Sequence, residues 1–274
     1  MGSTCEFSAP VPRAEPADFE NPRNCRGRFG HNDGSSDARH LNSTIWRSDG
    51  GRHGGNQRSG TNDLAPHDPG GNEMALTALV MAGGKATRMK SSTEKALLEV
   101  CGKTMLERVT DTLKQSRLVT RIVVAVTDTT PLTTRKAREL SLEVLETPGQ
   151  GYESDMRYAI KKLELGEVLV VSSDIPLVTV EIVEQAIRQF KSSGKPSLAV
   201  MTPVRVYENL GLDPQFIFEV NGNRMVPVGI NLLDGTMIDR GELDQEILVS
   251  ESESVALNVN TSRELELARL RCED

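Results

Sequence analysis

The sequence predicts an α/β fold: a Rossmann-like, mostly parallel sheet with helices on both faces and a small antiparallel β addition. Three observations support this prediction. From about residue 76 to residue 202, apolar strands alternate strictly with amphipathic helices, which is the pattern of βαβ units. Several of these strands are continuous apolar runs, which indicates that both of their faces are covered. Beyond Pro203 the rhythm changes, and two short strands flanking Asn221-Gly222-Asn223 predict a β-hairpin.

The 274-residue chain divides into two parts of different composition. Residues 1–73 are rich in Gly, Pro, Asn, Ser, Asp and Arg, contain no Lys and show no periodic apolar pattern. Such a segment cannot bury enough apolar surface to offset its chain entropy, so it is predicted to be a disordered N-terminal extension. Residues 74–274 have the length of one ordinary domain, and one hypothesis is that Met74 is the natural start.

The element boundaries carry local signals. Thr104-Met105-Leu106-Glu107 and Thr261-Ser262-Arg263-Glu264 match the capping box, in which the first and fourth residues satisfy each other's backbone N–H groups. Thr130-Pro131 places Pro in the first turn of a helix, and Thr179 is expected to cap another. Helices are therefore predicted at residues 104–116, from 130, at 152–165, at 179–193 and from 261. After the strand that begins at Leu76, strands are predicted at residues 121–127, 142–145, 167–171, 197–202, 216–220, 224–231, 248–249 and 255–259.

The distribution of histidine excludes several kinds of chemistry. All four histidines, His31, His40, His53 and His67, fall in the extension. Residues 74–274 therefore cannot contain a Ser-His-Asp triad, a histidine general base or a histidine-ligated zinc ion.

The cysteine spacing and the net charge indicate the cellular compartment of the protein and the classes of molecule it can bind. Cys101 and Cys272 lie far apart and no Cys-x-x-Cys spacing exists, so neither a zinc site nor a disulfide framework is indicated, and a reducing cytoplasm is expected. The net charge of −7, without a basic patch, argues against nucleic acid as a partner. No apolar run approaches the roughly 20 residues that cross a bilayer, so no membrane span is expected.

The first strand ends in a loop suited to phosphate. Its apolar run stops abruptly at Ala82-Gly83-Gly84, and the cations Lys85, Arg88 and Lys95 follow. Two glycines allow backbone N–H groups to converge on phosphate oxygens, and the cations supply neutralising charge. The spacing is neither a Walker loop nor Gly-x-Gly-x-x-Gly. An ordinary turn between strand and helix is the alternative interpretation.

Two further predicted strands end in glycine or polar residues that could contact a ligand, at Gly149-Gln150-Gly151 and Ser172-Ser173-Asp174. Ligands of open parallel sheets bind outside the carboxyl ends of the strands, so the three loops are expected at one edge. Asp174 is a candidate ligand of Mg²⁺, which favours one or two carboxylates together with substrate phosphates; capping of a turn is the alternative. Gly149 and Gly151 either shape a turn or allow close approach of a purine base.

The remaining polar clusters can be explained by helix capping, and one of them also by ligand binding. Glu153 and Asp155 open a helix and are expected to complement its macrodipole. Asn260 and Thr261 are candidate caps of the closing helix. Asn258, on the opposite strand face from Val259, is a candidate ligand for a metal ion or a substrate phosphate.

These motifs together resemble a known family. Residues 79–89 with Glu94-Lys95 are similar to the loop of nucleotidyltransferases that couple a nucleoside triphosphate to a phosphorylated acceptor, including molybdenum cofactor guanylyltransferases and sugar-phosphate nucleotidyltransferases. The resemblance is most specific to the archaeal GTP:adenosylcobinamide-phosphate guanylyltransferases. It covers Leu76 to Leu270 through Gly149-Gln150-Gly151-Tyr152-Glu153, Leu169-Val170-Val171-Ser172-Ser173-Asp174, Val226-Pro227-Val228-Gly229-Ile230-Asn231 and Leu257-Asn258-Val259-Asn260-Thr261, in that order.

The resemblance implies a fold like that of nucleotide-diphospho-sugar transferases for residues 74–274. It also implies a reaction of GTP with adenosylcobinamide phosphate that yields adenosylcobinamide-GDP and pyrophosphate. An acceptor phosphate is already ionised at neutral pH, so the absence of histidine is compatible with this chemistry.

The resemblance further assigns roles to individual residues. The implied catalytic residues are Lys85 and Arg88 on the leaving pyrophosphate, Lys95 on the α-phosphate, and Asp174. The implied Mg²⁺ ligands are Asp174 and Asn258. The implied nucleotide or acceptor contacts are Ala82, Gly83, Gly84, Gly149, Gly151, Gly229, Asn231 and Asn258.

Two other functions stay open at the level of sequence. One is a different guanylyl- or cytidylyltransferase, for instance one that acts on molybdopterin, or another transferase of nucleoside triphosphates. The other is a non-catalytic nucleotide sensor on the same scaffold. The joint presence of Lys85, Arg88, Lys95 and Asp174 argues against the sensor. A homodimer is compatible with the sequence.

Overall fold

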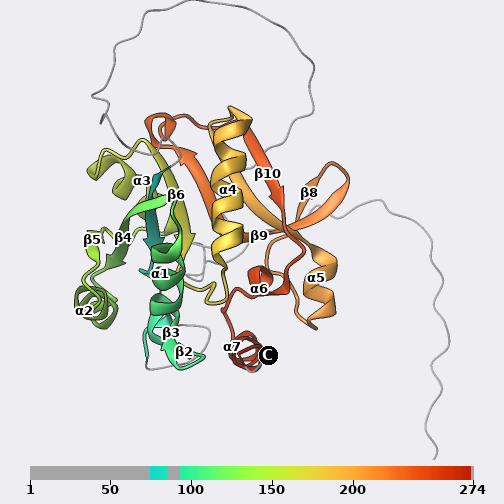
Figure 1. The fold of residues 1–274 in the computed structure, drawn as a ribbon, viewed down its shortest axis with the longest axis horizontal. Helices are drawn as coiled ribbons and strands as arrows, with labels where there is room; N and C mark the ends of the chain where they lie inside the picture. Colours follow the sequence, from blue (N-terminus) through green and yellow to red (C-terminus); the bar gives the residue numbers. More distant parts are fainter. Residues whose placement is uncertain (1–74, 85–92, 273–274) are drawn as a thin grey trace, which may run out of the picture. The chain divides into compact units, whose positions relative to one another are not determined.

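The computed structural model describes residues 75–84 and 93–272 (Figure 1). The predicted extension, residues 1–73, lies outside this part of the chain, so its predicted disorder stays a prediction. The cations Lys85 and Arg88 also lie outside the described residues.

The described residues are built on an eight-stranded sheet with the order β10-β7-β9-β6-β1-β4-β5, in which β8 pairs with β9. Its strands are β1 (Leu76–Met81), β4 (Val119–Thr127), β5 (Glu143–Thr147), β6 (Glu167–Ser172), β7 (Ser197–Pro203), β8 (Phe218–Val220), β9 (Asn223–Asp234) and β10 (Gln245–Val249). A separate two-stranded sheet consists of β2 (Glu99–Val100) and β3 (Lys103–Thr104). The helices are α1 (Met105–Gln115), α2 (Pro131–Glu139), α3 (Tyr152–Lys162), α4 (Val180–Ser193), α5 (Val204–Asn209), α6 (Glu253–Ala256) and α7 (Ser262–Leu270), with short 3-10 turns η3 (Lys95–Leu97) and η4 (Gly235–Met237).

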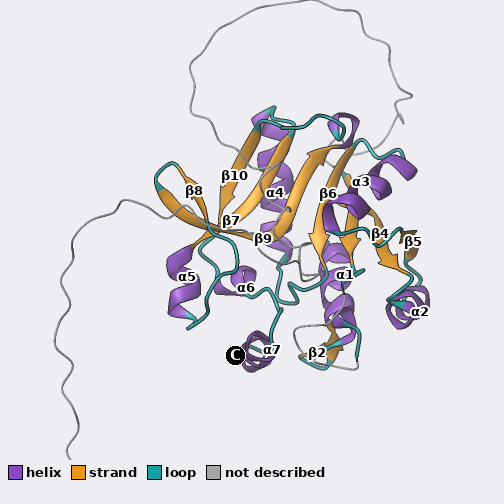
Figure 2. Ribbon diagram, turned by 180° about the vertical axis from the view of Figure 1, so that it is seen from behind, coloured by secondary structure: helices purple, strands orange, loops and turns teal. Residues whose placement is uncertain are grey.

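The predicted α/β fold with helices on both faces is confirmed. Ala78 and Val80 of β1 pack into one apolar cluster with side chains of α1, α2 and α4, whereas Leu79 and Met81 join a second cluster with α3. This alternation follows from the two-residue period of a strand. Figure 1 shows α1 and α4 lying over the sheet, and Figure 2 shows the sheet from behind.

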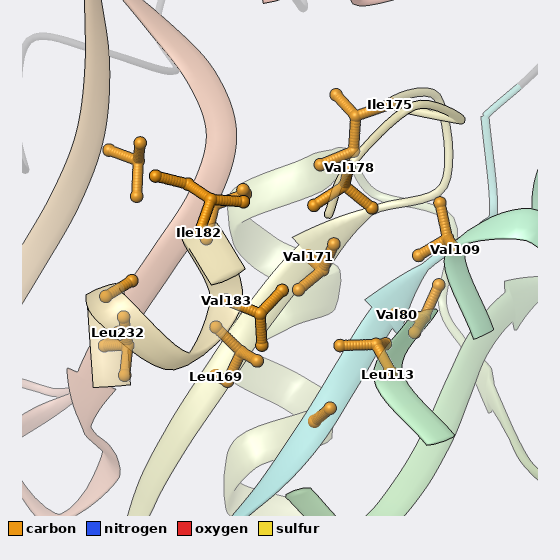
Figure 3. Close-up of a cluster of buried hydrophobic side chains, with 14 of the residues drawn as sticks. Val80, Val109, Leu113, Leu169, Val171, Ile175, Val178, Ile182, Val183 and Leu232 are labelled. Carbon is orange, nitrogen blue, oxygen red and sulfur yellow. The ribbon is translucent and has the colours of Figure 1, made fainter. Parts of the chain in front are cut away.

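The larger cluster is continuous from β1 across β6 to β9. Figure 3 shows Val80 beside Val109 and Leu113 of α1, and Leu169 and Val171 of β6 beside α4. Because the strands are apolar on both faces, they lie in the middle of a three-layer arrangement.

The predicted hairpin is confirmed, but its second strand lies inside the main sheet. β9 pairs antiparallel with β8 and also lies between β6 and β7, antiparallel to both. Among the described strands of this sheet, β9 alone runs against the others. The antiparallel strand β9 therefore lies within the main sheet. It connects the strands β6, β1, β4 and β5 on one side to β7 and β10 on the other.

The prediction of a strand at residues 255–259 is wrong. Residues 253–256 form the short helix α6, and the following residues, up to the start of α7, are in neither helix nor strand. The Val259 N–H donates to the carbonyl oxygen of Asp174 at 2.8 Å, so the segment is held by a loop rather than by a neighbouring strand. The predicted alternation of Asn258 and Val259 across a strand is wrong for the same reason.

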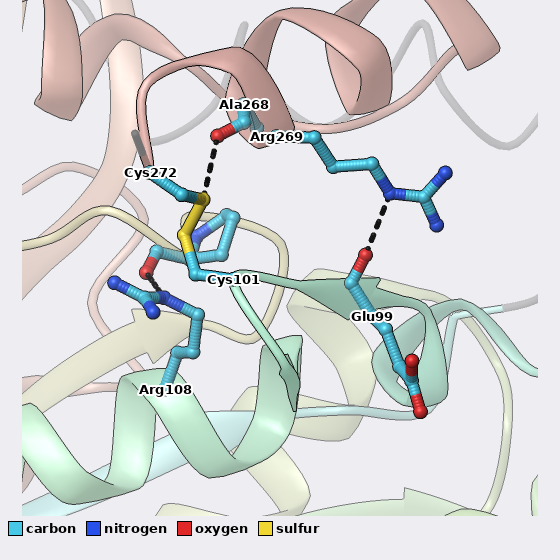
Figure 4. Close-up of a disulfide and its surroundings, with 7 residues drawn as sticks. Glu99, Cys101, Arg108, Ala268, Arg269 and Cys272 are labelled. Atoms are coloured by element: carbon cyan, nitrogen blue, oxygen red, sulfur yellow. Dashed lines mark hydrogen bonds between the residues drawn. A yellow bond between two sulfur atoms is a disulfide. The ribbon is translucent and has the colours of Figure 1, made fainter. Parts of the chain in front are cut away.

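Cys101 and Cys272 form a disulfide, with their Cα atoms 5.3 Å apart (Figure 4). The prediction that no disulfide forms is therefore wrong, and the argument for a reducing cytoplasm that rested on it no longer holds. A separation of 171 residues gives no spacing signal in the sequence. The bond ties the β2-β3 turn to the end of α7, next to a hydrogen bond from Arg269 to the carbonyl oxygen of Glu99.

Both predicted capping boxes are present, and one of them also fixes α2. Glu107 accepts hydrogen bonds from the backbone N–H of Thr104 at 2.9 Å and from its hydroxyl at 2.8 Å. The Lys136 ammonium of α2 lies 2.7 Å from the same carboxylate. Burial opposes ionisation of Glu107, but the hydrogen bonds from Lys136 and Thr104 outweigh it and lower the pKa to about 2.

We expect Glu107→Gln to lower the free energy of unfolding by about 1–2 kcal/mol at pH 7, because the cap and the ion pair both weaken. A lowered pKa in the folded state contributes stability above the unfolded value near 4.5, and this stability is lost as the pH falls toward about 2. Urea titrations from pH 7 to pH 3 should therefore show the difference between wild type and variant shrinking below pH 4.5. Glu266→Gln, an exposed change on α7, is the control. A difference that is independent of pH would contradict this assignment.

Candidate active site

The carboxyl ends of four parallel strands bring the predicted loops to one edge. β6, β1, β4 and β5 are neighbours in this order and run in the same direction. The Ser173 N–H donates to the carbonyl oxygen of Met81 at 3.1 Å, and the Ala82 N–H donates to that of Ala125 at 2.8 Å. The predicted convergence of the glycine loop, the Gly149–Gly151 loop and Asp174 is therefore present in the fold.

Thr127, the last residue of β4, supports two of these loops. A Cβ atom on Gly83 would lie 2.7 Å from the Thr127 methyl carbon, which is closer than side-chain atoms pack. A Cβ atom on Gly149, whose φ is +71°, would lie 3.6 Å from the same carbon. Glycine at position 83 therefore allows the loop to lie against β4. Thr127 is a site-shaping residue that the sequence reasoning missed.

Asp155 holds the Gly149–Gly151 loop. Its carboxylate accepts hydrogen bonds from the Gly149 N–H at 2.9 Å and from the Gln150 N–H at 3.2 Å, and the residue is buried. Gly151 precedes α3 with a φ of +110°, which favours glycine. Asp155 therefore shapes the loop directly, in addition to lying in the first turn of α3 as predicted.

Lys95, Asp174 and Asn260 form the polar centre of this edge. The Lys95 ammonium pairs with Oδ2 of Asp174 and donates to Oδ1 of Asn260 at 2.7 Å. The Asn260 amide in turn donates to Oδ1 of Asn258 at 2.9 Å. Three segments far apart in sequence thus share one hydrogen-bonded cluster, and Asn260 belongs to it, whereas Thr261 is the cap of α7.

Asp174 is the residue of this cluster with an unsatisfied group. It is only 8% exposed, and its Oδ1 atom has no hydrogen-bond partner among the described residues. A buried carboxylate oxygen without a partner is costly unless a ligand or an ion completes it. The free oxygen therefore makes Asp174 a candidate ligand position beside Lys95.

Glu94 fixes the place of Lys95. Its two carboxylate oxygens accept hydrogen bonds from the Leu132 N–H at 2.8 Å and the Thr133 N–H at 2.6 Å, at the start of α2. These N–H groups have no partners within the helix, so Glu94 caps α2 from outside. The residue before the central cation is thereby anchored to a helix terminus, and no local sequence signal indicates this contact.

Gly229 and Asn231 lie on β9 next to the cluster. Between Ala199 and Met201 the register of β7 against β9 is broken, and this irregularity coincides with Gly229, whose φ is +83°. A Cβ atom on Gly229 would lie 3.0 Å from the Cβ atom of Ser172 and 3.7 Å from the Asn258 amide nitrogen. Glycine thus lets β9 pass close to the end of β6.

A cavity of about 270 Å³ opens beside Asp174, Asn258 and Asn260. Part of its wall is apolar and is formed by Tyr152, Met156, Tyr207, Phe216, Val226 and Leu233. The phenol of Tyr152 is hydrogen bonded to Asn231, and burial together with the nearby charge of Asp174 raises the pKa of Tyr152. The phenol is therefore a neutral group at physiological pH.

The part of the chain that the structure describes contains no cluster of three or more His, Cys, Asp or Glu side chains able to hold a metal ion by themselves. It also contains no helix that is long and apolar enough to cross a membrane.

Comparison with known proteins identifies the family. Residues 78–222 match the MobA-like NTP transferase domain. The chain is 31% identical over 205 residues to the adenosylcobinamide-phosphate guanylyltransferase of Methanocaldococcus jannaschii, covering 71% of this chain and 96% of the relative. It is 33% identical over 119 residues to the bifunctional protein GlmU of Bacillus cereus, covering 43% of this chain but only 26% of that relative.

Solved structures agree on the fold. CMP:2-keto-3-deoxy-manno-octonic acid synthetase complexed with CTP superposes with a TM-score of 0.56 at 14% identity, covering 73% of this chain and 98% of that protein. Molybdopterin-guanine dinucleotide biosynthesis protein A of Archaeoglobus fulgidus superposes with a TM-score of 0.52 at 16% identity, covering 72% and 99%. Since the family match spans the three strand-end loops and the guanylyltransferase relative is covered over 96% of its length, the chain belongs to the MobA-like NTP transferase family and is a nucleotidyltransferase.

Proposed function

We propose that the protein transfers GMP from GTP to adenosylcobinamide phosphate, giving adenosylcobinamide-GDP and pyrophosphate in cobalamin biosynthesis. The similarity to a guanylyltransferase of this name over 96% of the relative supports the choice of substrates. The observation that carries the proposal is Asp174, which holds Lys95 through one oxygen and presents a buried, unpartnered oxygen beside the cavity.

The proposed reaction needs no group to remove a proton. An oxygen of the acceptor phosphate, already ionised, attacks the α-phosphorus of GTP and forms a new P–O–P bond. The bond between the α-phosphorus and the oxygen bridging to the β-phosphate breaks, and pyrophosphate leaves with its electron pair. Catalysis then consists of positioning and charge stabilisation, which suits a domain without histidine.

The proposed roles follow the order of the loops along the edge. Gly83 and Gly84 offer their backbone N–H groups to the triphosphate, beside Ala82, whose own N–H is bonded to Ala125. Lys85 and Arg88 hold the leaving pyrophosphate. Lys95 neutralises the α-phosphate when it exchanges part of its contact with Asp174 for substrate oxygen atoms. These assignments use charge-assisted hydrogen bonds, which are the stronger ones available to phosphate.

The proposed base and acceptor contacts lie on either side of this centre. The turn from Gly149 to Gly151, held by Asp155, offers backbone groups to guanine. Gly229 and Asn231 line the cavity and are proposed to lie near the ribose or the acceptor.

The residues present fit a bound Mg²⁺ ion. Asp174 offers an unpartnered carboxylate oxygen, and Asn258, whose amide oxygen also accepts from the Asn260 amide, lines the same cavity. Mg²⁺ takes few protein ligands, prefers oxygen and completes its shell with phosphate oxygens and water. When bound, the ion would supply charge neutralisation at the phosphates.

The test is a pyrophosphate-release assay with the full chain, Mg²⁺, each of GTP, ATP, CTP and UTP, and a set of phosphorylated acceptors. We expect release with GTP and adenosylcobinamide phosphate, and a product whose mass is that of adenosylcobinamide-GDP. Release with molybdopterin but not with the corrinoid would refute the proposed acceptor. No turnover with any acceptor would favour a nucleotide sensor instead.

A further inference from the structure

We infer that the cavity selects its acceptor by charge: Asp213 at its wall favours an acceptor whose body is apolar and neutral or cationic, and disfavours a polyanionic one. This inference rests on the proposed function in one respect, that the acceptor occupies this cavity. It goes beyond that function by naming the residue that discriminates between acceptors.

All charged side chains among the described residues that line the cavity are negative. The described residues that line the cavity include the carboxylates Glu153, Asp174, Asp213 and Glu264 and no Lys, Arg or His. An acceptor body that enters the cavity therefore meets oxygen atoms and apolar carbon, and no described lining cation to balance a negative charge.

Three of these carboxylates already have partners. Asp174 is paired with Lys95, and Oε1 of Glu153 lies 3.1 Å from the Arg157 guanidinium. Glu264 accepts hydrogen bonds from the backbone N–H groups of Asn260 at 2.6 Å and Thr261 at 2.7 Å. Asp174 and Glu153 are thus each paired with a cation, and the Glu264 carboxylate is held by backbone N–H groups.

Asp213 differs from the other three. It alone of the four is exposed, and it lies on the segment between α5 and β8. Like Glu264, it has no ion-pair partner among the described residues. Its neighbour Phe216 contributes apolar surface to the same cavity. Asp213 therefore gives the cavity an uncompensated negative charge next to an apolar wall.

The phosphate and the body of the acceptor would thus meet opposite environments. The phosphate end is proposed to lie at Lys95, where a Mg²⁺ ion on Asp174 would screen that carboxylate, whereas the body extends along apolar groups and the carboxylate of Asp213. Adenosylcobinamide matches this division, because its cobalt–corrin core is cationic and its rim carries neutral amides. Molybdopterin, which carries anionic sulfur and phosphate groups, does not match it.

The test compares two acceptors of nearly identical shape. One is adenosylcobinamide phosphate, and the other is the same corrinoid with peripheral amides hydrolysed to carboxylates. We expect the wild type to favour the amide form in kcat/KM by about 3- to 10-fold for each added carboxylate that comes within about 4 Å of the Asp213 carboxylate, the order expected for two exposed charges at that separation in water. Asp213→Asn should reduce this preference and Asp213→Lys should remove or invert it.

Glu208→Gln is the matched control, because it removes an exposed carboxylate from neighbouring α5 that does not line the cavity. It should keep the wild-type preference. Equal rates for both acceptors in the wild type, or an unchanged preference in Asp213→Lys, would overturn the inference.

A binding measurement separates this inference from the proposed function. Adenosylcobinamide and its carboxylate form, both without phosphate, are titrated into the full chain by calorimetry. Tighter binding of the amide form without any corrinoid turnover would refute the proposed reaction and support charge selection. Turnover of the corrinoid without discrimination in either assay would support the reaction and overturn charge selection.

Discussion

Asp174→Asn is expected to abolish Mg²⁺-dependent turnover, a loss of at least about 1,000-fold, while the fold stays intact. The substitution keeps the size of the side chain but replaces the unpartnered Oδ1 or the Oδ2 that holds Lys95 with an amide nitrogen. A neutral amide is a weaker ligand for Mg²⁺ than a carboxylate. The backbone carbonyl of Asp174, which receives the Val259 N–H, is unchanged, so the loop after α6 should remain in place.

The measurement is pyrophosphate release with GTP and the acceptor over a range of Mg²⁺ concentrations, together with far-ultraviolet circular dichroism. Asp111→Asn is the matched control, because Asp111 of α1 forms a partly exposed pair with Lys103 of β3 and neither residue lines the cavity. A rate like that of the wild type in Asp174→Asn would remove this residue from the site.

Lys95→Met is expected to lower kcat/KM by about 100- to 1,000-fold, the usual loss when one group that stabilises transition-state charge is removed. It should also lower the free energy of unfolding by about 1–3 kcal/mol, because the carboxylate of Asp174 loses its cation while it stays largely buried. The change thus affects activity and stability through the same contact.

A double variant distinguishes these two effects. Lys95→Met combined with Asp174→Asn removes the uncompensated charge, so the free energy of unfolding should recover while activity stays lost. Lys103→Met, at a lysine whose side chain is 55% exposed, should change neither quantity. If Lys95→Met lost stability without losing activity, Lys95 would be structural only.

Much of the fold could be predicted because its signals are local. Apolar runs on both faces of a strand, Thr-x-x-Glu capping boxes and the Asn221–Asn223 turn depend on residues within a few positions of each other, and the structure contains all of them. The convergence of strand-end loops also followed, since parallel neighbours place their carboxyl ends together.

The errors concern contacts between distant segments. The apolar residues Val255 and Val259 were consistent with a strand, but Val255 lies in α6 and Val259 in a loop, and both side chains pack into apolar clusters without pairing as a strand. The disulfide joins residues 171 positions apart, and no pattern along the chain connects them. The contact of Glu94 with the start of α2 and the support of two glycine loops by Thr127 depend in the same way on folding of the whole domain.

The sequence by itself determined the α/β class, the strand-end loops and the candidate residues Lys95, Asp174 and Asn258, because residue type and short spacing encode backbone freedom, charge and periodicity. Only the tertiary structure decided that β9 enters the sheet beside β6, that Asn260 joins Lys95 and Asp174, and that one carboxylate oxygen of Asp174 is left free beside the cavity. The physical reason is that burial, partner choice and unsatisfied hydrogen-bonding capacity are properties of packed segments, and these segments meet only after the chain has folded.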